Sequence, residues 1–118
     1  MKYTLLTLIL LLVSCGEAIT QGPHIPAVDA DDWTGAKITA DVQKKWRRTC
    51  ALCHVAGEGG APRMGDLDAW QPRLAQGRDM LLHHTITGLN RMPPLGYCMD
   101  CSEDDFIAMI RMMVGERP

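Results

Sequence analysis

The chain has 118 residues, a length that suits one domain. Its 12 Lys and Arg residues nearly balance its 14 Asp and Glu residues, so the formal net charge of −2 argues against a nucleic-acid-binding protein. Apolar residues make up 47% of the chain, which is too many for a disordered protein. Aromatic residues make up only 5%, so a core built from side chains alone would lack its usual large residues.

The chain begins with the pattern of a secretion signal. Lys2 precedes an apolar run over residues 5–13, which is about half of the ~20 residues that a membrane-spanning helix needs. The run ends in LVSC, residues 12–15, which resembles the lipobox of bacterial lipoproteins. In that family the chain is cleaved before the cysteine, whose sulfur then receives a lipid. We therefore expect residues 1–14 to be a signal peptide and Cys15 to be lipidated.

A second interpretation of the leader is ordinary cleavage after Ala18, which would release a soluble protein. Either cleavage places the protein in the periplasm. Because Gly16 rather than Asp follows Cys15, the resemblance to lipoproteins implies the outer membrane as the site of the anchor. Residues 15–36 contain Pro, Gly and Asp without an apolar period, so they are expected to form a flexible tether.

Residues 37–118 predict a small all-helical domain. The first of four expected helices begins after Thr39 and runs to Cys50, and the second runs from a cap at Asp68 to Leu74. The third covers residues 78–87 and stops at Gly88, and the last begins at Ser102. The expected core residues are Val42, Trp46, Leu74, Leu81, Ile86, Phe106 and Ile110.

The sequence Cys50-Ala51-Leu52-Cys53-His54 is a Cys-x-x-Cys-His motif, which is typical of covalent c-type haem attachment. Residues three apart on a helix share a face, so both thiols can reach the two vinyl groups at one edge of a porphyrin. His54 follows directly and can offer an imidazole nitrogen to the iron. The motif therefore predicts one haem c, attached through Cys50 and Cys53.

The cysteines allow two other interpretations. Cys50, Cys53, Cys98 and Cys101 could form a four-sulfur zinc site, but the 44 residues between the two pairs exceed the usual spacing of about 15–20. A thioredoxin-like redox pair would require a βαβ pattern, which neither motif has. Haem attachment is therefore favoured over both.

The sixth iron ligand decides between electron transfer and chemistry at an open site. Met92 lies 38 residues after His54 in the sequence NRMPP, whose two prolines restrict the backbone and could aim the thioether. The methionines expected on helices suit flexible core packing better than ligation. The other candidates by residue type are Met64, Met80, Met99, Met109, Met112 and Met113. An open sixth site, as in a haem enzyme or gas sensor, is the alternative function.

Several segments between Cys50 and Cys101 resemble the cytochrome c5 family of class I c-type cytochromes. They are CALCH, GAPRMGD, WQPRLAQGRDMLLHHTITG, NRMPP and CMDC. The resemblance implies a class I fold wrapped around one covalent haem, His54 and Met92 as axial ligands, and a disulfide between Cys98 and Cys101. It also implies a non-enzymatic role in which single electrons pass between transient respiratory partners, such as a membrane oxidoreductase or a terminal reductase or oxidase.

Four further residues are expected around the haem. The outer nitrogen of His54 should donate to a carbonyl, and Pro62 occupies the place where class I relatives supply it. Met64 stands where relatives commonly have Phe, which implies a wall of the haem pocket. Trp70 and Arg73 are expected near the haem propionates, with exposure to solvent as an equal alternative for Arg73. His83 and His84 are expected to be surface or capping residues.

Overall fold

The computed structural model describes residue 33 and residues 35–115. The expected signal peptide, the lipidation site Cys15 and most of the expected tether lie outside the described residues. No helix among the described residues is long and apolar enough to cross a bilayer.

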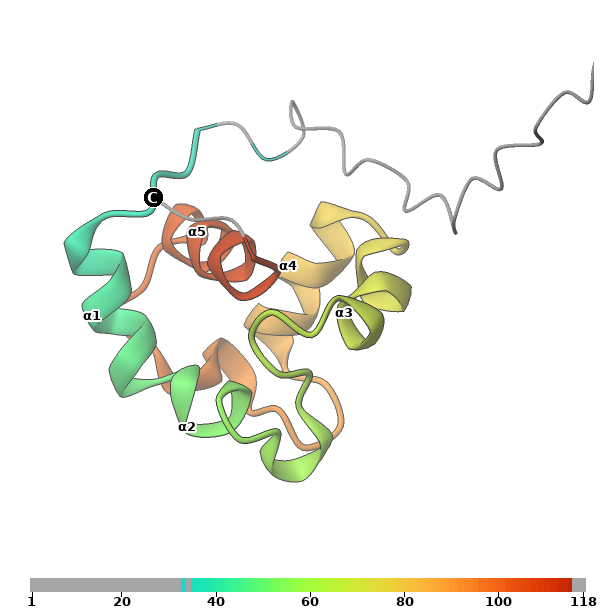
Figure 1. Ribbon diagram of the computed structural model, residues 1–118. Helices are drawn as coiled ribbons and strands as arrows, with labels where there is room; N and C mark the ends of the chain where they lie inside the picture. Colours follow the sequence, from blue (N-terminus) through green and yellow to red (C-terminus); the bar gives the residue numbers. More distant parts are fainter. Residues whose placement is uncertain (1–32, 34, 116–118) are drawn as a thin grey trace, which may run out of the picture.

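The described part of the chain is helical and contains no β-strand, which confirms the all-α prediction. Figure 1 shows the helices as a ring in which α5 lies between α1 and α4. The elements in chain order are α1 (Ala40–Arg48), α2 (Ala51–His54), η2 (Glu58–Gly60), α3 (Leu67–Leu74), α4 (Arg78–Thr87), η3 (Pro94–Tyr97) and α5 (Glu103–Met113).

Capping side chains explain where α1, α3 and α5 begin. The Thr39 side chain accepts a hydrogen bond from the Val42 amide, and Ser102 begins the last helix as predicted, through a reciprocal capping box with Asp105. Helix α3 begins differently from the prediction. Its cap is Asp66, whose carboxylate accepts from the Ala69 amide at 3.1 Å, so the expected cap Asp68 lies inside the first turn.

The sequence predicts that the first helix runs to Cys50, at the start of the haem-attachment motif. The structure differs, because the motif does not continue this helix. Helix α1 ends at Arg48, and Thr49 has φ −129° and ψ −88°, outside the helical region. The Thr49 hydroxyl donates to the Lys45 carbonyl at 2.7 Å, so it satisfies one of the carbonyls freed at the helix end. The motif therefore lies on the separate short helix α2, which turns away from α1.

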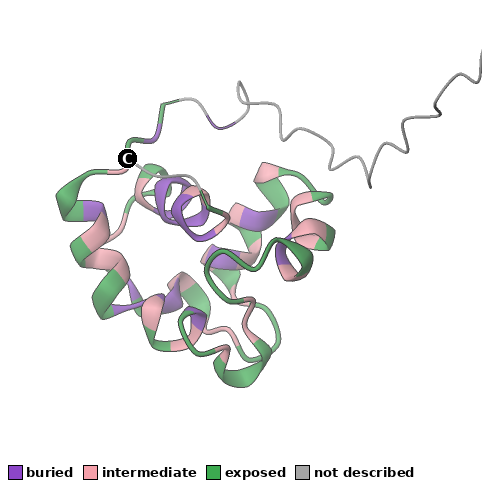
Figure 2. Ribbon diagram, viewed as in Figure 1, coloured by how far each residue is buried: buried purple, intermediate pink, exposed green. Residues whose placement is uncertain are grey.

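Helix α5 forms the centre of the core, and Figure 2 shows it as the most continuously buried helix. Four predicted core residues are buried, namely Val42, Leu81, Phe106 and Ile110. The other three, Trp46, Leu74 and Ile86, are partly buried against the same cluster. Met109, Met112 and Met113 are buried as expected, whereas Met80 is 44% exposed and is not a core residue.

The segment before α1 packs onto the same helix. Trp33 and Ala36 are both buried, and the Arg111 guanidinium of α5 donates to their two carbonyl oxygens. The end of the expected tether is thus attached to the domain.

An ion pair joins α1 to the start of α5. The Lys45 ammonium lies 2.9 Å from the Asp105 carboxylate and 3.1 Å from that of Asp41. The Lys45 and Asp105 side chains are only 17% and 15% exposed. Burial raises the pKa of Asp105, but hydrogen bonds from Lys45 and Ser102 outweigh it, so the net pKa lies below the usual value.

We expect Asp105→Asn to lower the free energy of unfolding at pH 7, because a carboxyl whose pKa is depressed on folding stabilises the protein above its unfolded pKa. That contribution disappears as the pH falls through the folded pKa. The difference between the two proteins should therefore shrink below the ordinary Asp pKa of about 3.9. Urea denaturation from pH 7 down to pH 2.5 measures it, and a pH-independent difference would contradict the assignment.

Candidate functional site

A cavity of about 160 Å³ lies within the ring of helices, and the attachment motif lines it. Cys53 and His54 line it from α2, Cys50 lines it from the position just before that helix, and Met92 lines it from the loop before η3. The apolar lining also includes Leu81, Ile110 and Met113. The structure therefore brings together the four residues for which haem attachment and ligation were predicted.

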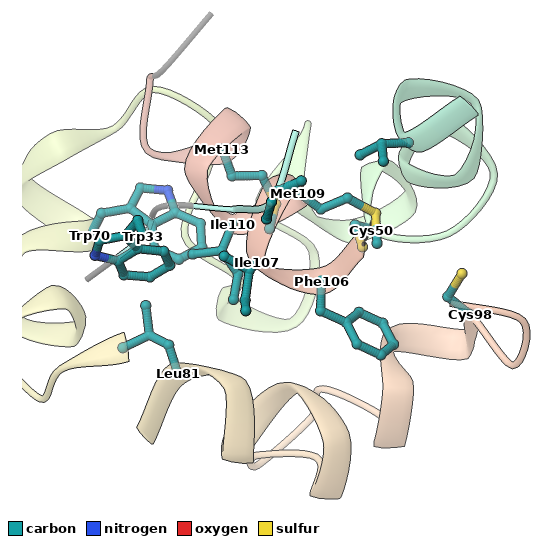
Figure 3. Packing of buried hydrophobic residues seen from close by; sticks show 13 residues of the cluster. Trp33, Cys50, Trp70, Leu81, Cys98, Phe106, Ile107, Met109, Ile110 and Met113 are labelled. Atoms are coloured by element: carbon teal, nitrogen blue, oxygen red, sulfur yellow. Dashed lines mark hydrogen bonds between the residues drawn. The ribbon is translucent and has the colours of Figure 1, made fainter. Parts of the chain in front are cut away.

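The two motif cysteines differ in environment. Cys50 is 7% exposed, whereas Cys53 is half-buried. Burial raises the pKa of the Cys50 thiol above its usual value. Figure 3 shows the Met109 side chain extending from α5 toward Cys50, and the two sulfur atoms lie 3.9 Å apart. The Cys50 side of the motif is thus packed against the central helix.

His54 is buried and held by a hydrogen bond through its outer nitrogen. Its Nδ1 lies 2.7 Å from the carbonyl oxygen of Pro62, the residue that the resemblance indicates for this role. Because a carbonyl can only accept, Nδ1 carries the proton and Nε2 is left with a lone pair. Burial lowers the pKa of His54, which favours the neutral imidazole that binds metals.

Met92 is positioned by a tight turn and by the following 3₁₀-helix. The backbone amides and carbonyls of Leu89 and Met92 exchange two hydrogen bonds, at 3.1 and 2.9 Å. A Cβ atom at Gly96 would lie 3.7 Å from the Met92 methyl and 3.8 Å from the Cys50 sulfur. The Met92 thioether and the first motif cysteine therefore approach the same glycine.

Of the other expected pocket residues, Met64 is placed differently from the prediction. It is 41% exposed and does not line the cavity. Its contact with His54 is made by the backbone, because the Met64 amide donates to the His54 carbonyl at 2.8 Å. Arg73 and Trp70 do line the cavity. The Trp70 indole nitrogen donates to the Arg63 carbonyl at 2.8 Å, so it is occupied within the protein.

The structure places at the cavity two helical residues for which the sequence predicted other roles, a surface or capping role for His84 and core packing for Met113. His84 is half-buried in α4 and lines the cavity, whereas His83 is exposed as expected. Met113 lines it from α5. The sequence predicts that both residues lie on helices. Which side of each helix faces the cavity depends on packing between the helices.

The second cysteine pair is separate from the cavity. Cys98 and Cys101 are joined as a disulfide with a Cα–Cα distance of 5.4 Å, the pairing that the resemblance implies. Neither residue lines the cavity. Asp100 lies close to both sulfurs, but sulfurs in a disulfide are not thiolate ligands, so this group does not favour zinc.

The residues around the cavity fit a covalently attached haem. The thiols of Cys50 and Cys53 line one largely apolar space together with the imidazole of His54 and the thioether of Met92. Arg73 and Arg91 add positive charge to the lining, which suits the carboxylates of a haem. The donor set therefore matches the cofactor that the motif predicts.

Comparisons with known proteins point to the same group of proteins. Residues 37–113 match the family model described as cytochrome C oxidase, cbb3-type, subunit III. Cytochrome c5 of Ectopseudomonas mendocina is 42% identical over 83 residues, which are 69% of this chain and 92% of that protein. Cytochrome c5 of Azotobacter vinelandii is 43% identical over 83 residues, covering 69% and 96%.

Solved structures also resemble this one. A mono-heme ferrocytochrome c from Shewanella putrefaciens superposes with a TM-score of 0.59 at 38% identity, covering 69% of this chain and all of that one. A chain in the crystal structure of the electron transfer complex of nitrite reductase with cytochrome c gives a TM-score of 0.59 at 36% identity, covering 66% and 95%.

We expect Gly88→Ala to destabilise the protein more than Gly77→Ala does. The two glycines flank α4 and share a backbone conformation that costs other residues about 1–3 kcal/mol, with φ +85° at both. A Cβ at Gly77 meets nothing within 4 Å, whereas one at Gly88 would lie 2.8 Å from the Met92 carbonyl oxygen. Chemical denaturation measures both losses, and equal losses would show that the contact with Met92 is unimportant.

Proposed function

This chain belongs to the cytochrome c5 family of class I c-type cytochromes, and from that premise we propose that His54 and Met92 are the axial ligands of its haem iron. As a member of that family it binds one c-type haem covalently and acts as a haem-based electron carrier. The observation that carries the ligand assignment is that both side chains and both motif cysteines line one cavity.

The chain's own residues attach and orient the cofactor. Cys50 and Cys53 would each form a thioether bond to one of its vinyl groups, and their i, i+3 spacing presents both sulfurs to one edge. The Pro62 carbonyl keeps the proton on Nδ1 of His54, which leaves the lone pair on Nε2 and would let that nitrogen bind the iron. When bound, the haem supplies a one-electron Fe(III)/Fe(II) couple.

With both axial positions filled by the chain, no coordination position remains for an outside molecule. This supports a role as a carrier rather than as an enzyme or gas sensor. Thioether ligation also raises the reduction potential relative to ligation by a second histidine. Met92 is suited to the role because the Leu89–Met92 hydrogen bonds and the prolines that follow restrict its backbone.

We infer that the partners are redox proteins that bind transiently. One similar structure comes from a complex of a cytochrome c with a nitrite reductase, which supports a terminal reductase as one class of partner, beside a membrane oxidoreductase or an oxidase. Leu52 and Val55 are 62% and 60% exposed and flank Cys53 and His54, so they offer a small apolar contact beside the attachment site. Small contacts of this kind suit rapid exchange of partners.

For the whole chain we propose secretion to the periplasm, with residues 1–14 as signal peptide and residues 15–36 as tether of the domain over residues 37–118. A lipid on Cys15 would hold it at the outer membrane, and soluble periplasmic protein is the alternative. The Cys98–Cys101 disulfide, which an oxidising compartment permits, agrees with this location.

Replacing Met92 by Ala should abolish the iron(III)–thioether charge-transfer absorption and lower the reduction potential, because the iron loses its thioether ligand. The reduced variant should also bind carbon monoxide at the vacated position. Visible spectroscopy and redox titration measure these changes, and an unaltered spectrum would refute the assignment.

Two further methionines serve as controls for this variant. Met113→Leu removes the other thioether that lines the cavity, and Met99→Ala removes the thioether of a residue that is 79% exposed. Both variants should retain the charge-transfer absorption. Its loss in Met113→Leu alone would identify Met113 as the ligand in place of Met92.

Intact-mass spectrometry of the purified mature protein tests its covalent modifications. We expect the mass of residues 15–118 plus one haem and the acyl groups of a lipoprotein, less the two hydrogens of the Cys98–Cys101 disulfide. A chain that begins at Ile19 without lipid would show that the protein is released as a soluble one.

A further inference from the structure

Trp70 contacts the proposed iron ligand in a way that the sequence did not predict. It is only 4% exposed, and its ring stacks on the His54 imidazole with centroids 5.7 Å apart and planes 21° from parallel. Its indole Nε1–H donates to the Arg63 carbonyl at 2.8 Å. One side chain therefore contacts the imidazole and also holds the loop beside it.

That loop is bound to His54 at two points. The Pro62 carbonyl accepts from Nδ1 at 2.7 Å, and the Met64 amide donates to the His54 carbonyl at 2.8 Å. Arg63, whose carbonyl accepts the indole hydrogen bond, lies between these two contacts in the chain. Removing the indole N–H would take away one of the two hydrogen bonds that the Arg63 carbonyl accepts, the other coming from the Asp66 amide at 3.1 Å.

We propose that Trp70 is a positioning residue for His54. The Trp70 side chain fixes the plane of the imidazole and keeps the Pro62 carbonyl directed at Nδ1. The inference rests on the proposed ligation of iron by His54. A hydrogen bond from Nδ1 to a carbonyl makes the imidazole a better electron donor, which favours the oxidised metal. Trp70 thus acts, through Pro62, to lower the reduction potential of the haem.

The other tryptophan on a described helix provides a matched comparison. Trp46 is partly buried against the core from α1 and does not line the cavity. Its buried indole nitrogen has no hydrogen-bond partner among the described residues. The same substitution at the two positions therefore removes a bonded N–H in one case and an unbonded one in the other.

The test compares Trp70→Phe with Trp46→Phe in the haem-loaded protein. Phenylalanine keeps an aromatic ring beside His54 but cannot donate to the Arg63 carbonyl. We expect Trp70→Phe to raise the reduction potential, giving a severalfold smaller Fe(III)/Fe(II) ratio at a fixed solution potential. NMR should also show several-fold faster solvent exchange of the His54 Nδ1 proton and the Met64 amide. Trp46→Phe should change none of these quantities.

An unchanged potential and unchanged exchange in Trp70→Phe would overturn the proposal, as would equal changes in Trp46→Phe. A measurement on the unmodified protein covers the case in which Trp70→Phe does not fold. There the Trp70 indole proton and the His54 Nδ1 proton should be protected from exchange to a similar degree, because one loop opening exposes both. A rapidly exchanging indole proton beside a protected Nδ1 proton would overturn the proposal.

Failure of the ligand assignment is distinguishable from failure of this inference. If His54 binds the iron, its imidazole resonances in the oxidised, unmodified protein are shifted strongly by the paramagnetic metal. Imidazole resonances without these paramagnetic shifts would refute the proposed ligation. Strongly shifted resonances together with an unaffected Trp70→Phe variant would refute only the positioning role.

Discussion

The fold of this small chain depends on a cavity that its own side chains do not fill. The sequence contains only one Phe, two Tyr and three Trp, and the described helices form a ring around the space that the attachment motif lines. Helix α5 supplies more buried side chains than any other described helix, and its contacts with α1 and α4 hold the ring together. A covalently bound porphyrin supplies the missing apolar volume, so cofactor and chain share one core.

The two sides of the cavity are built in different ways. On the His54 side, side chains hold the backbone: the imidazole donates to the Pro62 carbonyl, and the Trp70 indole donates to the next residue along. On the Met92 side, the backbone holds the side chain through the paired hydrogen bonds of Leu89 and Met92 and the close approach of Gly88. Both arrangements restrict movement of a proposed ligand.

Such restriction suits the transfer of single electrons. An electron carrier works best when its ligands stay in place in both oxidation states, because little structural reorganisation then accompanies each transfer. A carrier must also keep outside molecules away from the metal, which the two proposed ligands, His54 and Met92, would achieve. The exposed side chains beside Cys53 and His54 leave a contact for partners at the edge of the same site.

Local sequence signals determined much of this structure by themselves. Thr39, Gly88 and the pair Ser102 and Asp105 act within a few residues of their own position, so the helix ends that depend on them could be predicted. The attachment motif and the Met-Pro-Pro sequence likewise identified the residues that meet in the cavity, because their chemistry is specific.

Only the tertiary structure decided the features that depend on residues distant in the chain or on competition between equivalent neighbours. Asp66 rather than Asp68 caps α3, and Thr49 separates α2 from α1, although the local signals allowed either arrangement. Met64 faces solvent while Trp70 stacks on His54, because the path of the loop between them places only Trp70 against the imidazole. A sequence pattern specifies which side chains can act, whereas packing specifies which of them touch.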